Sequence, residues 1–390
     1  MSKFLMNNYN PLPVSFVSGE GSWLIDNKGE RYLDALSGIA VCGLGHSHPS
    51  LSEIIADQSV NLIHTSNIYE IPLQEELAKK LIIHSGMDNV FFCNSGAEAN
   101  EAAIKLARLY ASKKKISNPT VVVMKNSFHG RTLATLSATG STKVHKGFEP
   151  LVSGFKHIPY NDIEALESVI QKEKNIVAVL LEPIQGEGGI IVPKKDYLKK
   201  IRSICDKNDF LMIVDEVQSG MCRTGKWFAF QHDDVLPDVV TVAKALGNGV
   251  PIGACMARKK SSKLFQPGSH GSTFGGSPFV SRVALGVIDI LETNKMDEYA
   301  AKLGSYLLDN FRESLKGIYG VVDIRGKGLM IGIELEKECL DLVEKALKNK
   351  LLINVTSGNV IRLLPPLVMS EKEADQVVSV LTNVLKKYLH

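Results

Sequence analysis

Short apolar runs alternate with longer amphipathic stretches from about residue 89 to residue 257. The runs are almost continuously apolar and rich in β-branched residues, which is typical of strands buried on both faces of a mostly parallel sheet. We expect such strands at 89–93, 121–125, 176–182, 211–215, 239–243 and 252–257. Apolar side chains recur at helical spacing between them, so we expect helices at 98–112, 161–174 and 195–207. This alternation predicts an α/β layer architecture.

The two ends of the chain have a different pattern. Residues 1–45 show short strand segments separated by turns, and residues 300–390 mix two helices with short strands. We therefore expect a large α/β domain at 50–290. A smaller α+β domain is expected to combine an N-terminal part, 1–49, with a C-terminal part, 291–390.

Composition limits the class of protein. The 45 Lys and Arg residues nearly balance the 42 Asp and Glu residues, for a net charge of +3. We therefore expect no nucleic acid and no membrane surface among the partners. No apolar run approaches the roughly 18 residues needed to cross a bilayer, and the N-terminus lacks the features of a secretory signal. The six cysteines are scattered, and the histidines of segment 46–48 lack further ligands at suitable spacing. We expect a cytoplasmic protein with reduced thiols and no metal.

Two of the predicted strands end in residues that carry chemistry, at the sheet edge where functional groups of open parallel sheets collect. Asp215 either caps the following turn or pairs with a buried cation such as a protonated ring nitrogen. Lys244 either reaches solvent or is a desolvated amine whose lowered pKa lets it form an imine. An imine-forming lysine with such an aspartate is the pair that pyridoxal 5′-phosphate enzymes require.

That cofactor also needs a site for its phosphate and a surface for its ring. Ser95, Gly96 and Ala97 open the helix predicted after strand 89–93, where they form either a phosphate site or an ordinary N-cap. The turn at 271–276 is a second phosphate candidate. Phe128 is either a stacking surface for the ring or a packed core side chain.

Several motifs extend this picture over most of the chain. From residue 91 to residue 367 they are, in order, FFCNSGAEANEAAIKLAR, SFHGRT, LEPIQGEGG, IVDEVQSGMCRTG, AKALGNGVPIGA, HGSTFGGSP, RGKGLMIGIEL and IRLLPPL. Together they resemble the class III pyridoxal-phosphate-dependent aminotransferases of fold type I. The resemblance implies that fold, with helices flanking the central sheet, and it implies transamination.

The resemblance also implies a role for each cofactor-binding residue. Lys244 binds the cofactor covalently and moves the substrate proton, and Asp215 pairs with the ring nitrogen. The phosphate is implied to be held by Ser95, Gly96 and Ala97, and Phe128 is implied to stack on the ring. Val217 and Gln218 are implied to pack against the ring and to contact its hydroxyl. Thr273 is implied to reach the phosphate in the neighbouring subunit, so the sites need a homodimer.

Substrate-binding roles are implied for two further pairs of residues. Arg131 matches the position that grips the substrate α-carboxylate through a guanidinium fork, and Ser272 matches a position that also touches substrate. The alternative interpretation of Arg131 is a surface arginine beside a turn, with no role in binding. Arg362 is implied to bind the α-carboxylate of glutamate or 2-oxoglutarate, and Glu187 to neutralise it when an ω-amine enters. A fixed salt bridge is the alternative for this pair.

The segments RYLDALSGIAVCGLGHSHP and HTSNIYEIPLQEELAKKL resemble one branch of the family in particular. This resemblance implies N2-acetyl-L-ornithine (acetylornithine) as amino donor and 2-oxoglutarate as acceptor, in arginine biosynthesis. Succinylornithine, N-succinyl-diaminopimelate semialdehyde, free ornithine and 4-aminobutyrate remain alternatives, as does an aminomutase. The chain departs from the family pattern at Cys222, where glycine is frequent, and at Ser277, where asparagine is frequent. We expect Cys222 near the pocket entrance.

Overall fold

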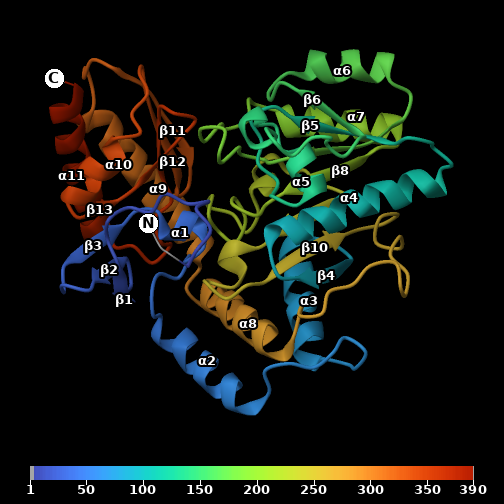
Figure 1. The fold of residues 1–390 in the computed structure, drawn as a ribbon, viewed down its shortest axis with the longest axis horizontal. Helices are drawn as coiled ribbons and strands as arrows, with labels where there is room; N and C mark the ends of the chain where they lie inside the picture. The colour runs from blue at the N-terminus through green and yellow to red at the C-terminus, as the bar shows by residue number, and fades with distance from the viewer. Residues whose placement is uncertain (1–3, 390) are drawn as a thin grey trace.

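The computed structural model describes residues 4–389, and a seven-stranded sheet forms its larger part (Figure 1). The strand order is β4-β10-β9-β8-β7-β5-β6. The strands are β4 (Asn89–Cys93), β5 (Thr120–Met124), β6 (Phe155–Ile158), β7 (Ile176–Leu181), β8 (Leu211–Asp215), β9 (Val239–Val242) and β10 (Gly253–Ala257). All neighbours from β9 to β6 are parallel, whereas β10 runs antiparallel to both β4 and β9. The expected mostly parallel sheet is confirmed.

Helices cover both faces of this sheet because successive strand residues point to opposite sides. Val121 and Val123 of β5 pack in one cluster with α4 (Gly96–Lys113), while Val122 and Met124 pack in another with α6 (Ile163–Lys172) and α7 (Tyr197–Asn208). Figure 1 shows α6 and α7 on one side of the strands and α4 on the other. The remaining helices of this part are α2 (Pro49–Asn61), α3 (Pro72–Ser85), α5 (Leu133–Ala138) and α8 (Pro278–Thr293).

The two ends of the chain meet in a smaller part. Its first sheet joins β1 (Phe16–Glu20), β2 (Trp23–Asp26) and β3 (Arg31–Asp34) to β13 (Leu351–Leu352), which runs parallel to β3. Its second sheet is antiparallel and has the order β11-β12-β15-β14, namely Val321–Lys327, Met330–Leu335, Val360–Leu363 and Asn354–Thr356. The helices here are α1 (Ser37–Ala40), α9 (Met296–Ser314), α10 (Leu342–Lys348) and α11 (Glu371–Leu389). The domain limits at residues 49, 50, 290 and 291 stay a prediction.

The apolar runs located the strands well but missed other elements. Each expected strand overlaps an observed one, and each expected helix overlaps α4, α6 or α7. The short strand β6 and the helices α2, α3 and α5 were not expected. The antiparallel direction of β10 was not expected either, because an apolar run has the same pattern in both directions. Within residues 4–389, no helix is long and apolar enough to span a bilayer.

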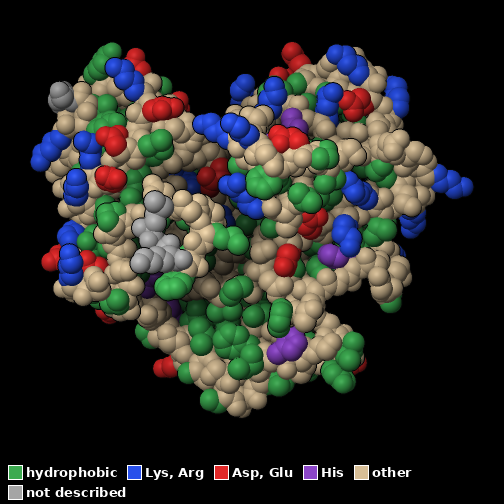
Figure 2. Space-filling view, in the orientation of Figure 1, with side chains coloured by type: hydrophobic (Ala, Val, Ile, Leu, Met, Phe, Trp, Pro, Cys, Tyr) green, Lys and Arg blue, Asp and Glu red, His purple; other side chains and the backbone are tan. Residues whose placement is uncertain are grey.

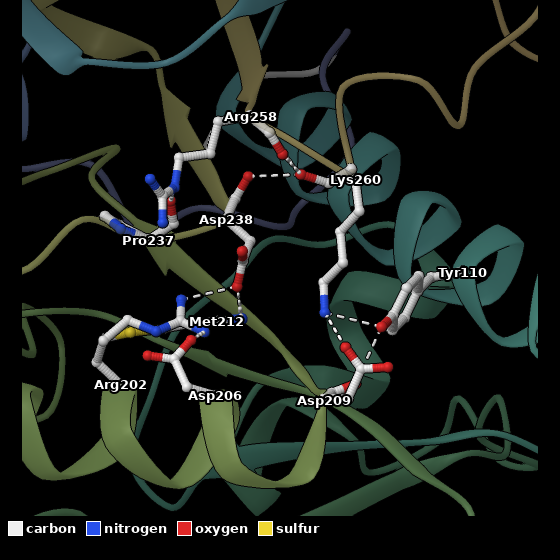
Figure 3. Close-up of polar contacts among 10 residues, drawn as sticks. Tyr110, Arg202, Asp206, Asp209, Met212, Pro237, Asp238, Arg258 and Lys260 are labelled. Atoms are coloured by element: carbon white, nitrogen blue, oxygen red, sulfur yellow. Dashed lines mark hydrogen bonds and ion pairs between the residues drawn. The ribbon is translucent and has the colours of Figure 1, made fainter.

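A buried ion pair ties α7 to the sheet (Figure 3). Asp238 precedes β9, and its Oδ2 accepts hydrogen bonds from Nη1 of Arg202 at 2.7 Å and from the backbone N–H of Met212 at 2.9 Å. Arg202 also contacts Asp206 at 2.8 Å, one turn along α7. The Asp238 side chain is 6% exposed, whereas that of Asp206 is 67% exposed. The two carboxylates therefore offer a buried and an exposed partner to the same guanidinium.

We predict that Asp238→Ala lowers the free energy of unfolding by about 3–5 kcal/mol, because it leaves a guanidinium that is largely buried without its partner. Asp206→Ala is the matched control, and its cost should stay below about 1 kcal/mol because the pair that it breaks is solvated. Urea unfolding of the two variants measures the difference. Equal losses of stability would show that Asp238 does not anchor α7.

Candidate active site

A pocket of about 340 Å³ lies at the carboxyl edge of the large sheet. Its walls come from the segments that follow β4, β5, β8 and β9, since the carboxyl ends of parallel strands meet at one edge. Lys244, Asp215, Ser95, Gly96, Ala97, Phe128, Arg131, Val217 and Gln218 all line it. The structure thus brings together most of the predicted site residues.

Lys244 opens the short 3-10 helix Lys244–Leu246 directly after β9. Its φ of +48° lies in the left-handed region, which costs free energy for any residue other than glycine. Burial, with a contribution from the positive charge of Arg362, lowers the pKa of the Lys244 amine to about 8. A substantial fraction of the amine is therefore neutral and nucleophilic near neutral pH.

The Asp215 carboxylate is buried and hydrogen-bonded on both oxygens. Its Oδ1 accepts from the backbone N–H of Val217 at 3.0 Å, so it does cap the turn after β8. Its Oδ2 lies 2.7 Å from Nδ2 of Asn100 and 2.8 Å from Nδ1 of His129. Because the same carboxylate lines the pocket, the two interpretations made from the sequence are compatible: it caps a turn and is placed to meet a cation.

The junction of β4 and α4 presents backbone N–H groups to the pocket wall. Ser95 is the N-cap of this helix, and its hydroxyl oxygen accepts from the backbone N–H of Glu98 at 3.2 Å. The first turn of the helix begins with Gly96 and Ala97, which leave backbone N–H groups without intrahelical partners. A Cβ on Gly96 would lie only 2.6 Å from Cγ1 of Val217, so the close packing of the two walls requires glycine there.

Arg131 stands where this pocket meets a second one of about 630 Å³. Its guanidinium carbon lies 5.4 Å from the centre of the Phe128 ring, and the two residues line both pockets. It forms no ion pair with any residue between 4 and 389. The second pocket also has walls from the smaller part of the molecule, and Figure 2 shows a cleft between the two parts with charges of both signs on its walls.

The predicted pair Glu187 and Arg362 is formed as a salt bridge beside this second pocket. Arg362 is completely buried on β15, and its Nη1 also lies 3.3 Å from Oε1 of Gln218 in the first pocket. Its Nε donates to Oδ1 of Asn354 at 3.0 Å. The Glu187 side chain is 37% exposed, so the pair joins a buried cation to a partly solvated carboxylate.

The turn at 271–276 lies apart from the first pocket. The Ser272 hydroxyl oxygen accepts from Nδ2 of Asn94 at 3.1 Å, which connects it to the pocket wall. Thr273 is exposed and lines neither pocket within this chain. Its predicted contact with a phosphate therefore depends on a second subunit.

Three buried polar residues of the pocket were not assigned a role from the sequence: Asn100, His129 and Glu182. Glu182 directly follows β7, so the rule that singled out Asp215 at a strand end would have found it. Burial, and the nearby charge of Asp215, hold the pKa of Glu182 well above its usual range. Asn100 and His129 carry no comparable signal, because their importance depends on contacts with residues far along the chain.

Cys222 does not lie at the pocket entrance. It is fully buried in the hydrophobic core, and burial raises the pKa of its thiol. Its φ of +67° is left-handed, which explains why glycine suits this position in the family pattern. Cys42 is the one half-buried cysteine, and the other five are buried.

Comparisons with known proteins agree with the site geometry. The model of the aminotransferase class-III family matches residues 4–385. The chain is 54% identical over 385 residues to the acetylornithine aminotransferase of Nitrosomonas europaea, which covers 99% of this chain and 98% of that protein. It is 48% identical to the acetylornithine aminotransferase of Aquifex aeolicus, covering 98% of this chain and 100% of that protein.

Solved structures extend the likeness to two substrate classes. The ornithine aminotransferase of Toxoplasma gondii has a TM-score of 0.95 and 35% identity, covering 99% of this chain and 93% of that chain. The acetylornithine aminotransferase of Elizabethkingia anophelis has a TM-score of 0.88 and 36% identity, covering 99% and 97%.

Proposed function

The chain belongs to the class-III aminotransferases, and from this premise we propose that it transfers the δ-amino group of N2-acetyl-L-ornithine to 2-oxoglutarate. The products are N-acetyl-L-glutamate 5-semialdehyde and L-glutamate, and the reaction belongs to arginine biosynthesis in the cytoplasm. The observation that carries the choice of substrate is the unpaired Arg131 between the lysine pocket and the Glu187–Arg362 pair. The relatives named acetylornithine aminotransferase, at 54% and 48% identity over nearly the whole chain, support it.

Pyridoxal 5′-phosphate is the cofactor, and the residues present fit it. The N-terminus of α4 offers N–H donors and the Ser95 hydroxyl to a phosphate, at a glycine that a Cβ would block. Asp215 offers a buried carboxylate to a ring nitrogen, and Lys244 offers an amine whose pKa is lowered to about 8. When bound, the cofactor acts as an electron sink for the substrate carbon that loses a proton.

Each of the pocket residues would have its own role in binding the cofactor or in moving the substrate proton. Lys244 would hold the cofactor, and its amine would accept the proton from the substrate carbon and return it. Phe128 would offer an aromatic face to the ring, Val217 and Gln218 would border it, and Gly96 and Ala97 would offer N–H donors to the phosphate. Asp215 would offer a carboxylate to the ring nitrogen for a charge-assisted hydrogen bond.

Arg131 would fix the far end of the donor. A guanidinium fork binds a carboxylate bidentately, and the α-carboxylate of acetylornithine is the charged group farthest from its δ-amine. Ser272, held by Asn94, lies at the same side and completes the substrate contacts. Since Arg131 has no anionic partner among the residues described, a substrate carboxylate would not have to displace one.

The Glu187–Arg362 pair would let one site serve two substrates. With acetylornithine bound, Glu187 would neutralise Arg362 through the salt bridge that the two side chains form. With 2-oxoglutarate or glutamate bound, Glu187 turns toward solvent and Arg362 takes the α-carboxylate. The partial exposure of Glu187 and the complete burial of Arg362 assign the movement to the glutamate.

Free ornithine is the second candidate donor, because the TM-score to an ornithine aminotransferase is the higher of the two reported. The backbone similarity reports the shared fold, whereas the choice of donor depends on a few side chains. The α-ammonium of ornithine would need its own carboxylate. Four carboxylates line the two pockets. Asp215 is hydrogen-bonded to Asn100 and His129, and Glu187 is paired with Arg362. Glu182 is buried against backbone N–H groups, and Glu338 is exposed.

The working unit would be a homodimer with shared active sites. Large apolar side chains are exposed around the connection between α2 and α3 and on the turn at 271–276: Val60, Ile63, Ile68, Tyr69 and Phe274. Figure 2 shows hydrophobic side chains gathered over α8 and the chain beside it. Asn67 donates to the carbonyl oxygens of Ser272 and Gly275, which holds the Thr273 turn against this surface. A second subunit covering the surface would receive Thr273 at its own phosphate site.

Steady-state assays with a panel of amino donors and 2-oxoglutarate test the proposed substrate. We predict the highest kcat/KM for acetylornithine, with free ornithine lower, and no turnover without added keto acid, which separates the enzyme from an aminomutase.

Arg131→Ala should raise KM for acetylornithine at least about tenfold, because charge-assisted bonds to a carboxylate are lost. The KM of pentylamine, which has no carboxylate, should change little, and Arg131→Lys should be intermediate. Equal effects on both amines would remove Arg131 from the carboxylate site.

We predict that the rate at which the apoenzyme attaches pyridoxal phosphate rises with pH up to about 8 and then levels off. Below this pH the Lys244 amine is protonated and not nucleophilic, and above it the amine is already neutral. Visible absorption after mixing measures the rate, and Lys244→Ala should show no covalent band. Arg362→Gln should move the midpoint upward, since it removes a positive charge that favours the neutral amine. A rate that keeps rising beyond pH 10 would contradict the lowered pKa.

Mixing two inactive variants tests the shared site. In a hybrid of Lys244→Ala and Thr273→Ala subunits, one of the two sites keeps both Lys244 and the partner's Thr273, so we expect up to about a quarter of wild-type activity after statistical mixing. Activity equal to the sum of the two parent dimers would show that Thr273 does not serve the neighbouring subunit.

A further inference from the structure

The buried carboxylate of Asp215 has more donors than a turn cap requires. Besides the Val217 N–H on Oδ1, its Oδ2 contacts the side chains of Asn100 and His129 at 2.7 and 2.8 Å. These two side chains come from α4 and from the segment after β5, elements that are far from β8 in the sequence. A buried carboxylate stays ionised only if such donors replace its lost hydration.

Asn100 is held in one orientation. Its Oδ1 accepts from the hydroxyl of Thr241 at 2.7 Å, so its Nδ2 must point toward Asp215. The same Nδ2 donates to the backbone carbonyl of His129 at 2.8 Å. Asn100 therefore fixes both the carboxylate and the backbone of the second donor.

His129 acts as a neutral donor in this arrangement. Its Nδ1 faces a carboxylate oxygen, which can accept hydrogen bonds from both Asn100 and His129 but cannot donate one, so Nδ1 carries the hydrogen. Its Nε2 is buried and has no hydrogen-bond partner among the residues described, so a second proton would create a buried, unsatisfied positive charge. The N–H of His129 donates to the Thr139 hydroxyl at 2.9 Å, which holds the residue in place.

Two further carboxyl groups lie close to Asp215 and compete for ionisation. Burial and the charge of Asp215 hold the pKa of Glu182 well above its usual range, and burial raises the pKa of Glu216 to about 7. Among these three groups, only Asp215 receives side-chain amide and imidazole donors. Asp215 is therefore the one of these three carboxyl groups that side chains of two other elements supply with N–H donors.

We propose that His129 and Asn100 are positioning residues that keep Asp215 ionised and aimed at the ring nitrogen of the cofactor by donating neutral hydrogen bonds. The inference rests on the proposed function. Neutrality matters because an imidazolium beside Asp215 would cancel the charge that the ring nitrogen is to meet. The two donors stabilise the carboxylate and leave its charge available.

The protonation of the cofactor ring nitrogen is the direct readout. Holoenzyme loaded with pyridoxal phosphate labelled with ¹⁵N in the ring reports it through the ¹⁵N chemical shift. We expect the protonated value in the wild type and a shift toward the unprotonated value in His129→Leu and Asn100→Leu. The dissociation constant of the cofactor should rise, and kcat should fall at least about tenfold with little change in KM, since the lost bonds act on the ring and not on the substrate.

His129→Asn is the matched control, because its side-chain amide places an N–H near the position of Nδ1. It should restore the ring ¹⁵N shift and most of kcat, whereas a purely structural role would be served equally by Leu. His129→Gln, whose amide reaches the position of Nε2 instead, replaces His129→Leu if the latter does not fold. Variants that bind the cofactor with an unchanged ring ¹⁵N shift would overturn the proposal. A wild type that fails to transaminate any donor would instead overturn the proposed function.

Discussion

The structure around the active site depends on one constraint, the burial of the Asp215 carboxyl group at the end of β8. A buried charge is tolerated only with several hydrogen-bond donors, and here the donors come from three different elements. The register of β8 against β9, the depth of α4 and the course of the chain after β5 must all agree for Asn100, His129 and Val217 to meet at one carboxylate. The packing of the helices and strands of the large sheet therefore also brings the residues around Asp215 together.

The buried amine of Lys244, unlike the Asp215 carboxyl group, has no hydrogen-bond partner among residues 4–389 that would stabilise its charged form. Burial and the charge of Arg362 lower its pKa to about 8, and no ion pair with a described residue holds the amine in its charged form. The left-handed backbone at this residue adds local strain that the surrounding fold has to sustain. The pocket thus surrounds the Asp215 carboxyl group with donors on one side and leaves the Lys244 amine partly neutral on the other. An amine that acts first as a nucleophile and then as a base has to be partly neutral, as Lys244 is here.

The smaller part of the molecule completes the substrate end of the site. Arg362 lies on β15, yet it contacts Glu187 and Gln218, which follow strands of the large sheet. Because the guanidinium is buried, its position is set by the packing of the two parts against each other. The cleft between them is where substrates of different charge would have to be accommodated, and the partly exposed Glu187 gives the pair one movable member.

The sequence by itself determined the strands, since continuous apolarity marks β5, β7, β8 and β9 as buried on both faces, and it placed Lys244 and Asp215 at their carboxyl ends. Motif resemblance added Phe128, Arg131 and the residues of the helix N-terminus, which the fold brings into one pocket. Only the tertiary structure decided the direction of β10, the burial of Cys222, and the contacts of Asn100 and His129 with a carboxylate 115 and 86 residues away. The physical reason is that hydrophobic periodicity encodes which side of a strand or helix is buried, whereas hydrogen bonds between buried polar groups depend on which elements are neighbours in space.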